Sequence, residues 1–255
     1  MKGEIFKGVK QWDTEFDGAR AKRPLFFYDS FSMQAIYTAS TKKVLKYIPH
    51  ADMHPVELVP GRCLVVFTAF EYRKSDIGPY NEFSIAIMIN WGGKVIPGLT
   101  MLKKMMSGNL TGYVWHLPVT AEIARHGGVV AYGLPKFIAD IDFKNNGQFI
   151  ECELSERKNT ILNFKGKILK TSKGKIRRFK TYSLINGIPL VTNIHTNQIK
   201  FAQSSGKDSS SIEIGDSHKI CHELREIDLS KRPFFYQYVP LSQSILFPAK
   251  NIMDN

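Results

Sequence analysis

β-branched and aromatic residues dominate the chain from residue 62 onward, in short segments separated by turn residues. Such segments are typical of strands with one buried face. Residues 62–72 and 82–89 flank turn residues at 75–79, so they predict a long hairpin. Apolar and acidic residues alternate over 138–143, which predicts another strand. Further strands are predicted at 95–96, 113–117, 149–154, 160–164, 178–184, 190–201 and 245–249.

Three segments carry helix signals instead. Residues 40–48 predict a helix that Ser40 caps and Pro49 stops. Residues 120–125 predict a short helix that Gly127 and Gly128 end, and residues 217–225 predict another. The apolar side of the first helix consists of Val44, Leu45 and Ile48.

Many short strands and few short helices predict an α+β fold that is mainly antiparallel β. We expect the sheet to form a curled or closed (conical) β-barrel with a few short peripheral helices. The 12 prolines and 19 glycines are spread along the chain, and there is no internal repeat, so we expect one domain over residues 1–255. Residues 1–23, which are mostly polar with scattered aromatics, are expected to form an N-terminal arm packed over this domain.

The composition is that of a globular protein, because 43% of the 255 residues are hydrophobic. The first residues are charged throughout, unlike a signal peptide, and the most apolar window, 83–91, is much shorter than the ~20 residues that cross a bilayer. The three cysteines have neither metal-site nor oxidoreductase spacing and are expected to be reduced thiols. These features predict a cytoplasmic protein without membrane association.

A net charge of +12 raises the question of an anionic partner. Much of the charge lies in 165–180, where basic residues at spacing two around 172–174 predict a hairpin with a basic outer face. A solvated outer face explains such a segment without any partner. Few aromatic residues accompany it, so we do not expect a nucleic-acid partner. The same charge can also attract a carboxylate substrate through its field.

Two motifs resemble those of the acetoacetate decarboxylase family. Gly133-Leu-Pro-Lys-Phe-Ile-Ala-Asp140 is similar to the family's G-[FY]-P-K-K-x-A-[DE], and Gly78-Pro-Tyr-Asn-Glu82 is similar to its G-P-Y-x-E. Their order and separation are those of the family. Weaker similarity at 35–37, 45–49 and 218–225 extends the resemblance over most of the chain.

The resemblance implies a closed or conical barrel that contains a reactive lysine, here Lys136, which forms a Schiff base with a ketone. It also implies that Glu82 is the general acid and base. Phe137 occupies the place of the family's second lysine. The implied enzyme is a carbon-carbon lyase (a carboxy-lyase) that acts on a small oxo acid, needs no cofactor and no metal, and forms a homo-oligomer. We expect Tyr80, Phe137 and Glu122 to contact the substrate.

This chemistry requires an unprotonated amine, whereas a lysine with its ordinary pKa of ~10.4 is protonated near neutrality. Acetoacetate decarboxylase is itself the usual example of a lysine made neutral by desolvation or by a nearby cation. Leu134, Pro135, Phe137 and Ile138 would supply the apolar surroundings. Once formed, the iminium withdraws electrons from the adjacent bond, so a β-keto acid can lose carbon dioxide.

Alternatives remain at this stage. Family decarboxylases carry an arginine and a glutamate at about the positions of Ser30 and Thr68, so an aldolase- or dehydratase-type Schiff-base enzyme acting on a 2-oxo acid is an alternative. The missing second lysine favours another, a non-catalytic barrel that binds a small molecule. A third, a nucleic-acid binder, would bind less tightly as salt is added.

Three other groups of polar residues have simpler explanations than a functional site. His218 and His222 lie four residues apart on a predicted helix, which suits a metal, but no third ligand follows at a recognisable spacing. His195 lies on a predicted strand and can point to either side. Glu122 and Arg125 can form an ordinary exposed pair.

Overall fold

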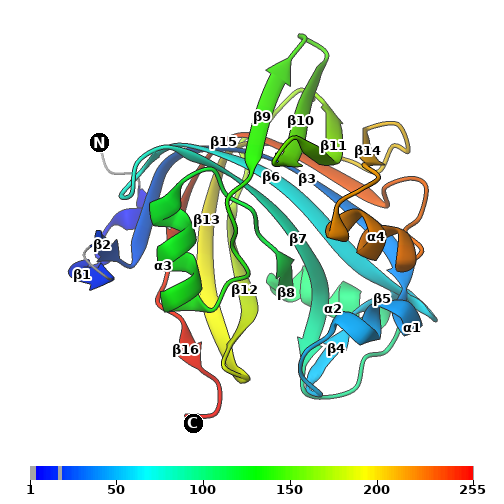
Figure 1. The fold of residues 1–255 in the computed structure, drawn as a ribbon, viewed down its shortest axis with the longest axis horizontal. Helices are drawn as coiled ribbons and strands as arrows, with labels where there is room; N and C mark the ends of the chain where they lie inside the picture. Colours follow the sequence, from blue (N-terminus) through cyan, green and yellow to red (C-terminus); the bar gives the residue numbers. More distant parts are fainter. Residues whose placement is uncertain (1–3, 17–18, 255) are drawn as a thin grey trace.

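The computed structural model describes residues 4–16 and 19–254. Seven strands form a closed barrel, because β6 pairs with both β3 and β7 at the two ends of one continuous strand order (Figure 1). Neighbouring barrel strands are antiparallel except β8 and β12, which are parallel. In chain order, the barrel strands are β3 (Leu25–Ser40), β6 (Arg62–Ser75), β7 (Tyr80–Trp91), β8 (Asn109–His116), β12 (Ile176–Ile185), β13 (Ile188–Ser204) and β15 (Phe235–Leu246). The predicted fold class is confirmed.

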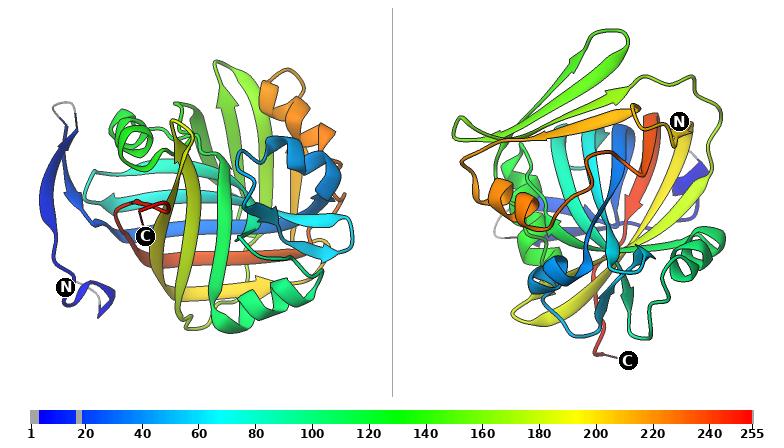
Figure 2. Two further views of the ribbon diagram at one scale, coloured as in Figure 1. Left: turned by 90° about the horizontal axis from the view of Figure 1, so that it is seen from below. Right: turned by 90° about the vertical axis from the view of Figure 1, so that its right-hand side faces the viewer.

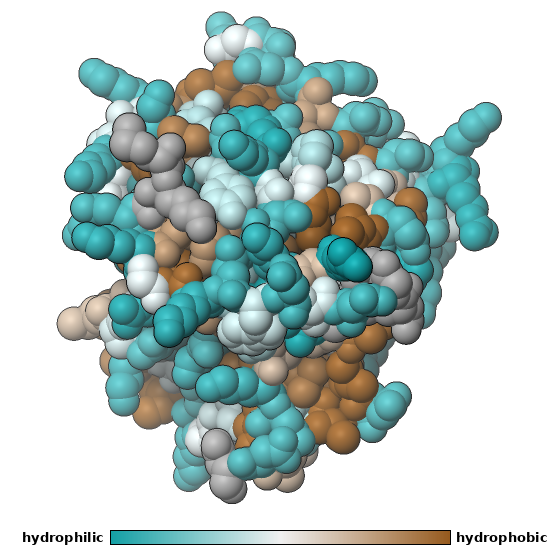
Figure 3. Space-filling view, turned by 90° about the vertical axis from the view of Figure 1, so that its left-hand side faces the viewer, coloured by the Kyte–Doolittle hydropathy of each residue, from teal (hydrophilic) through white to brown (hydrophobic). Residues whose placement is uncertain are grey.

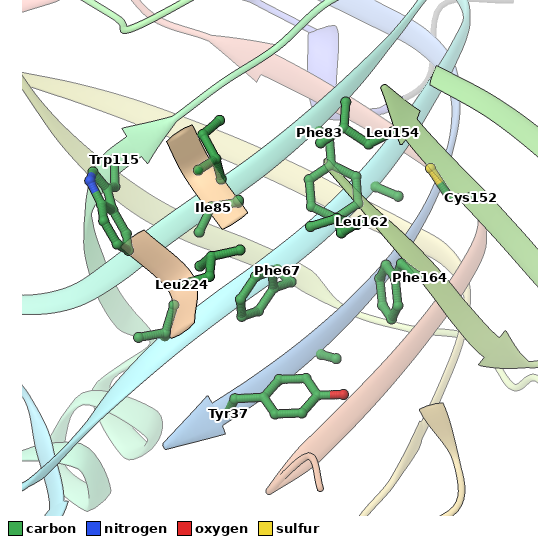
Figure 4. Close-up of a cluster of buried hydrophobic side chains, with 14 of the residues drawn as sticks. Tyr37, Phe67, Phe83, Ile85, Trp115, Cys152, Leu154, Leu162, Phe164 and Leu224 are labelled. Carbon is green, nitrogen blue, oxygen red and sulfur yellow. The ribbon is translucent and has the colours of Figure 1, made fainter. Parts of the chain in front are cut away.

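A second sheet of four strands packs against the barrel (Figure 2). Its strands are β9 (Asp140–Asn145), β10 (Phe149–Glu156), β11 (Asn159–Lys167) and β14 (Ser210–Ile214). Apolar side chains from this sheet, such as Leu154 and Phe164, meet Phe67, Phe83 and Ile85 of the barrel (Figure 4). The alternation predicted for 138–143 follows from this packing, since Ile141 is buried while Asp140 and Asp142 are exposed.

The remaining elements are short. The helices are α1 (Thr41–Val44), α2 (Leu99–Ser107), α3 (Glu122–Tyr132) and α4 (Lys219–Glu226), with 3-10 turns at Glu4–Phe6 and Leu45–Tyr47. The short strands are β1 (Trp12–Phe16), β2 (Ala19–Arg23), β4 (Met53–Pro55), β5 (Glu57–Val59) and β16 (Lys250–Asn251). No helix in the described part of the chain is long and apolar enough to span a bilayer. Cys63, Cys152 and Cys221 are buried free thiols.

The N-terminal segment lies across one end of the barrel, next to α3 (Figures 1 and 2). Phe6 packs on Phe26 with ring centroids 4.7 Å apart, and β1 and β2 form an antiparallel hairpin. Gln11 holds the base of this hairpin, because its Nε2 donates to the Pro24 carbonyl at 2.9 Å and to Asp76 Oδ2 at 2.6 Å. Of the residues predicted to form an arm, 1–3, 17 and 18 lie outside the described residues.

The structure corrects several predicted elements. Residues 95–96 form no strand, since the surrounding Gly92, Gly93, Pro97 and Gly98 favour turns. The last barrel strand ends at Leu246 instead of covering 245–249, because Pro248 cannot donate to a sheet ladder. The helix predicted at 40–48 is α1 followed by a 3-10 turn; Ser40 makes no side-chain cap and Leu45 is exposed. Strands β3 and β14 and helix α2 were not predicted.

The basic hairpin predicted around 172–174 is wrong. Strands β11 and β12 belong to different sheets, and the segment between them crosses from one sheet to the other. Ser172 exchanges two backbone hydrogen bonds of 2.9 Å with Phe201, which attaches this crossing segment to β13. Several of its basic side chains, including Lys170, Lys173 and Lys175, remain exposed.

Candidate active site

Backbone hydrogen bonds on both sides of Lys136 fix its position. Helix α3 ends at Gly133, whose φ of +59° favours glycine, and a Cβ there would meet Ile185 and the Leu184 carbonyl. The Lys136 amide then donates to the Leu134 carbonyl at 2.8 Å across Pro135, a three-residue turn. After the lysine, Val119 donates to the Phe137 carbonyl at 2.9 Å. The backbone on both sides of Lys136 is therefore held in place by hydrogen bonds.

Helix α3 continues through Gly127 and Gly128, which were predicted to end it. The position of the Lys136 side chain explains why residue 128 is a glycine. A Cβ on Gly128 would come within 2.7 Å of Lys136 Cε and closer still to Cδ. The lysine side chain thus crosses the helix where the helix has no side chain. Because a glycine in a helix interior costs roughly 1 kcal/mol relative to alanine, its presence here agrees with a close-packing requirement.

Lys136 forms a buried ion pair with Glu82. Its Nζ lies 2.6 Å from Glu82 Oε2, and the two side chains are only 7% and 9% exposed. Glu82 lies on β7, where successive residues point to opposite faces, so that Phe83 packs in the main core while Glu82 faces the lysine. Two buried opposite charges can both be removed by moving one proton from the amine to the carboxylate.

Tyrosines surround this pair. Tyr72 donates its hydroxyl to Glu82 Oε1 at 3.3 Å, and the Tyr80 ring centre lies 5.7 Å from Lys136 Nζ. Burial, and after it the nearby Glu82 carboxylate, raises the pKa of both tyrosines well above its ordinary value. Both phenols therefore stay protonated and can donate hydrogen bonds without adding a negative charge.

A cavity of about 50 Å³ adjoins the lysine. Its walls come from the barrel (Leu25, Tyr80 and Leu246), from α3 and the turn after it (Ala124, Gly128, Tyr132 and Leu134) and from the N-terminal hairpin (Ala21, Lys22 and Arg23). Most of these side chains are apolar or aromatic. A small, mainly apolar cavity with a few polar groups is typical of a site for a small molecule.

The structure brings together three of the five residues expected at the site, Lys136, Glu82 and Tyr80. Phe137 points away from the cavity, because neighbouring residues of an extended backbone point to opposite sides; it packs against the main core beside His218. Glu122 lies at the exposed start of α3 in an ion pair with Arg125 and is not on the cavity wall.

Ser30 on β3 and Thr68 on β6 are neutral at the two positions where an arginine and a glutamate were considered. Both are almost fully buried, with exposed fractions of 2% and 5%. Ser30 lies opposite Tyr72 in the β3–β6 register, and Thr68 accepts a hydrogen bond from Gln34 at 3.0 Å. Neither residue lines the cavity beside Lys136.

Of the other histidines considered from the sequence, His218 and His195 have structural contacts. His218 Nδ1 accepts from the Ile220 amide at the start of α4 and its Nε2 lies 3.1 Å from Glu156, whereas His222 is exposed. His195 packs on Phe247, and burial and then Arg178 lower its pKa. Within residues 4–16 and 19–254, no three His, Cys, Asp or Glu side chains are grouped to hold a metal ion.

Sequence reasoning missed Tyr72, Tyr132, Gly128 and Arg23. Tyr72 could have been found from the hairpin register, which sets it opposite Tyr80. No sequence signal identifies Arg23, because it reaches the cavity only through the folding back of the N-terminal hairpin.

Comparisons with known proteins agree with this fold. The family model for acetoacetate decarboxylase matches residues 15–193. An acetoacetate decarboxylase structure aligns with a TM-score of 0.65 and 15% identity over 90% of this chain and 89% of that chain. Another, from Legionella pneumophila subsp. pneumophila str. Philadelphia 1, aligns with a TM-score of 0.63 and 14% identity over 90% and 87%. The enduracididine biosynthesis enzyme MppR complexed with pyruvate aligns with a TM-score of 0.61 and 10% identity over 89% of each chain. None of the curated proteins compared with the chain matches it.

Proposed function

The chain belongs to the acetoacetate decarboxylase family, and from this premise we propose that it is a cofactor-independent enzyme that forms an iminium between Lys136 and a small oxo acid. The observation that carries the proposal is the buried pair of Lys136 Nζ and Glu82 Oε2, 2.6 Å apart beside a cavity. By the measure of about 10–15 Å³ for one water, the cavity holds roughly three to five waters. That space suits an acid of the size of pyruvate or acetoacetate.

The proposed reaction starts with proton transfer from Lys136 to Glu82. The neutral amine attacks the carbonyl carbon, and Glu82 returns the first proton to the carbonyl oxygen. Glu82 then carries a second proton from the attacking nitrogen to the same oxygen, which leaves as water, and the iminium nitrogen keeps one hydrogen. In a β-keto acid, the bonding electrons of the departing carboxylate move toward the positive nitrogen, so carbon dioxide and an enamine form. Protonation of the enamine carbon and hydrolysis of the iminium then release the ketone and restore the lysine.

The test is reductive trapping. Incubation with acetoacetate or pyruvate and borohydride should add a stable mass to the peptide that contains Lys136, and acetoacetate should release carbon dioxide. A pyruvate adduct without carbon dioxide release from acetoacetate would favour the aldolase- or dehydratase-type alternative, to which the neutral Ser30 and Thr68 point. Absence of an adduct with any small oxo acid would leave the non-catalytic barrel.

Glu82→Gln should separate the formation of the iminium at Lys136 from proton transfer by Glu82. Burial without a counter-charge disfavours an ammonium ion, so Lys136 in this variant can still become neutral and be trapped by borohydride. Turnover should nevertheless fall about 10²- to 10⁴-fold, because no carboxyl is left to move protons. Trapped mass and steady-state rate, measured on the same sample, check this. A wild-type turnover rate in this variant would mean that Glu82 does not transfer protons in the reaction.

A further inference from the structure

Helix α2 exposes an apolar surface. Met101 is the buried residue of this helix and packs with Leu64 and Met88 of the barrel strands. Residues 99, 102 and 106 recur at helical spacing on another side of the helix, and all three are apolar. The side chains of this surface are 52–81% exposed, and we call them the α2 ridge: Ile96, Leu99, Leu102, Met105 and Met106. An open apolar surface of this kind on a folded chain indicates a binding partner.

Lysines border the α2 ridge. Lys94, just before the helix, and Lys103, on it, are both exposed. The Lys104 amine donates to Thr111 Oγ1 of β8 at 2.8 Å, and Thr111 lies opposite Lys180 in the β8–β12 register. Burial, and after it the charge of Lys180, lowers the pKa of Lys104, so these two amines lie close enough to repel each other. Positive charge therefore accompanies the apolar side chains of the ridge.

The elements around the α2 ridge contain no acidic residue that could balance this charge. Residues 83–121, which include α2 and β8, and residues 157–207, which include β12 and β13, contain lysines and arginines but no aspartate or glutamate. A second copy placed on the ridge about a two-fold axis would set the same cations against each other. A surface of anionic lipids offers the opposite charge and, beneath it, an apolar layer.

We propose that the α2 ridge binds this protein to the surface of an anionic lipid bilayer. The ridge side chains enter the boundary between head groups and acyl chains, and the neighbouring lysines contact the lipid phosphates. This inference goes beyond the proposed function and does not depend on it. The expectation of no membrane association came from the lack of a spanning segment, and binding at a bilayer surface needs no such segment.

Sedimentation with lipid vesicles tests the proposal. The protein should sediment with vesicles of phosphatidylcholine and phosphatidylglycerol in equal amounts, and much less with vesicles of phosphatidylcholine alone. Added salt should weaken the binding, because it screens the attraction between exposed lysines and head groups. Lys103→Gln should raise the lipid concentration for half-maximal binding about 5-fold, as expected for the loss of one cation at an anionic surface.

The double variant Leu102→Ser, Met106→Ser tests the ridge itself. Both side chains are mostly exposed in the free protein, so the variant should melt close to the wild-type temperature. Its half-maximal lipid concentration should rise at least about 10-fold, because two apolar side chains no longer leave water on binding.

The matched control is the double variant Ile188→Ser, Met253→Ser, which also replaces two exposed apolar side chains. Ile188 begins β13, and Met253 follows β16, which pairs with β13. Strand β16 lies at the left in Figure 1, away from α2, and hydrophilic side chains cover most of the left-hand face of the molecule (Figure 3). This control should bind vesicles like the wild type.

Two results with vesicles would overturn the proposal: no binding of the wild type to either kind of vesicle, or equal binding by the wild type and by Leu102→Ser, Met106→Ser. Light scattering then identifies the other possible occupant of the ridge. If the wild type is an oligomer that this double variant dissociates, and it does not sediment with vesicles, the ridge joins two copies of this chain and the lipid proposal fails.

Discussion

Lys136→Met should give no borohydride adduct with acetoacetate or pyruvate, and turnover should fall about 10⁴-fold or more. Methionine has a similar length and no amine, so the cavity keeps its shape while the nucleophile is lost. Mass spectrometry of the trapped protein and the rate of product formation measure the two effects. An adduct of wild-type yield in this variant would place the reactive amine on another residue.

The same substitution should change stability in a pH-dependent way. It leaves the Glu82 carboxylate buried without its cation, and breaking a buried pair costs up to about 3 to 5 kcal/mol. Protonation of the carboxyl removes that charge. The loss in unfolding free energy should therefore be smallest at acid pH and grow as the pH rises, because the folded state of the variant favours the protonated form. Urea unfolding at several pH values measures this.

The double variant Lys136→Met, Glu82→Gln is the matched control for stability. It removes both charges and keeps the shape of both side chains, so its unfolding free energy should recover most of the loss and vary little with pH. Its activity should stay absent. A double variant as unstable as the single one would mean that packing around the methionine, and not the uncompensated charge, causes the loss.

The strand pattern predicts the sheet well because one face of each barrel strand packs in an apolar core. The β6–β7 hairpin and the alternation in β9 follow directly from this burial. The hairpin predicted around residues 172–174 was wrong because the basic residues there are not buried in any core. Their spacing of two is the same whether the flanking strands join one sheet or two. Pairing between distant strands is decided by the whole barrel and leaves no local signal at that turn.

The candidate site likewise has residues that the sequence predicts and residues that it misplaces or misses. Short motifs locate Lys136 and Glu82, and the fold then brings these two residues, which are 54 positions apart, to 2.6 Å. Phe137 and Glu122 were expected at the cavity because they lie near the lysine along the chain, yet an extended backbone and an exposed helix start direct them away from it. Arg23 approaches the cavity from the distant N-terminal hairpin, which sequence spacing does not reveal.

Gly128→Ala should inactivate the protein without unfolding it. The added methyl group would overlap Lys136 Cδ and Cε, so the lysine side chain must move away from α3 and lose its 2.6 Å contact with Glu82. A displacement of about 1 Å at a reacting group can lower the rate about 10²-fold. Alanine favours the helix by roughly 1 kcal/mol over glycine, which offsets part of the strain in the stability of the fold. The rate of borohydride trapping and the melting temperature together measure both effects.

Gly127→Ala is the control for Gly128→Ala, because the two glycines are neighbours in the same helix. A Cβ on Gly127 meets no atom within 4 Å, so this variant gains the helix preference without touching the lysine. It should melt at or above the wild-type temperature and be trapped at a rate close to that of the wild type. If Gly128→Ala is trapped as fast as Gly127→Ala, the lysine reaches its substrate by a path that does not cross α3. The missing side chain at residue 128 would then have no part in placing the amine.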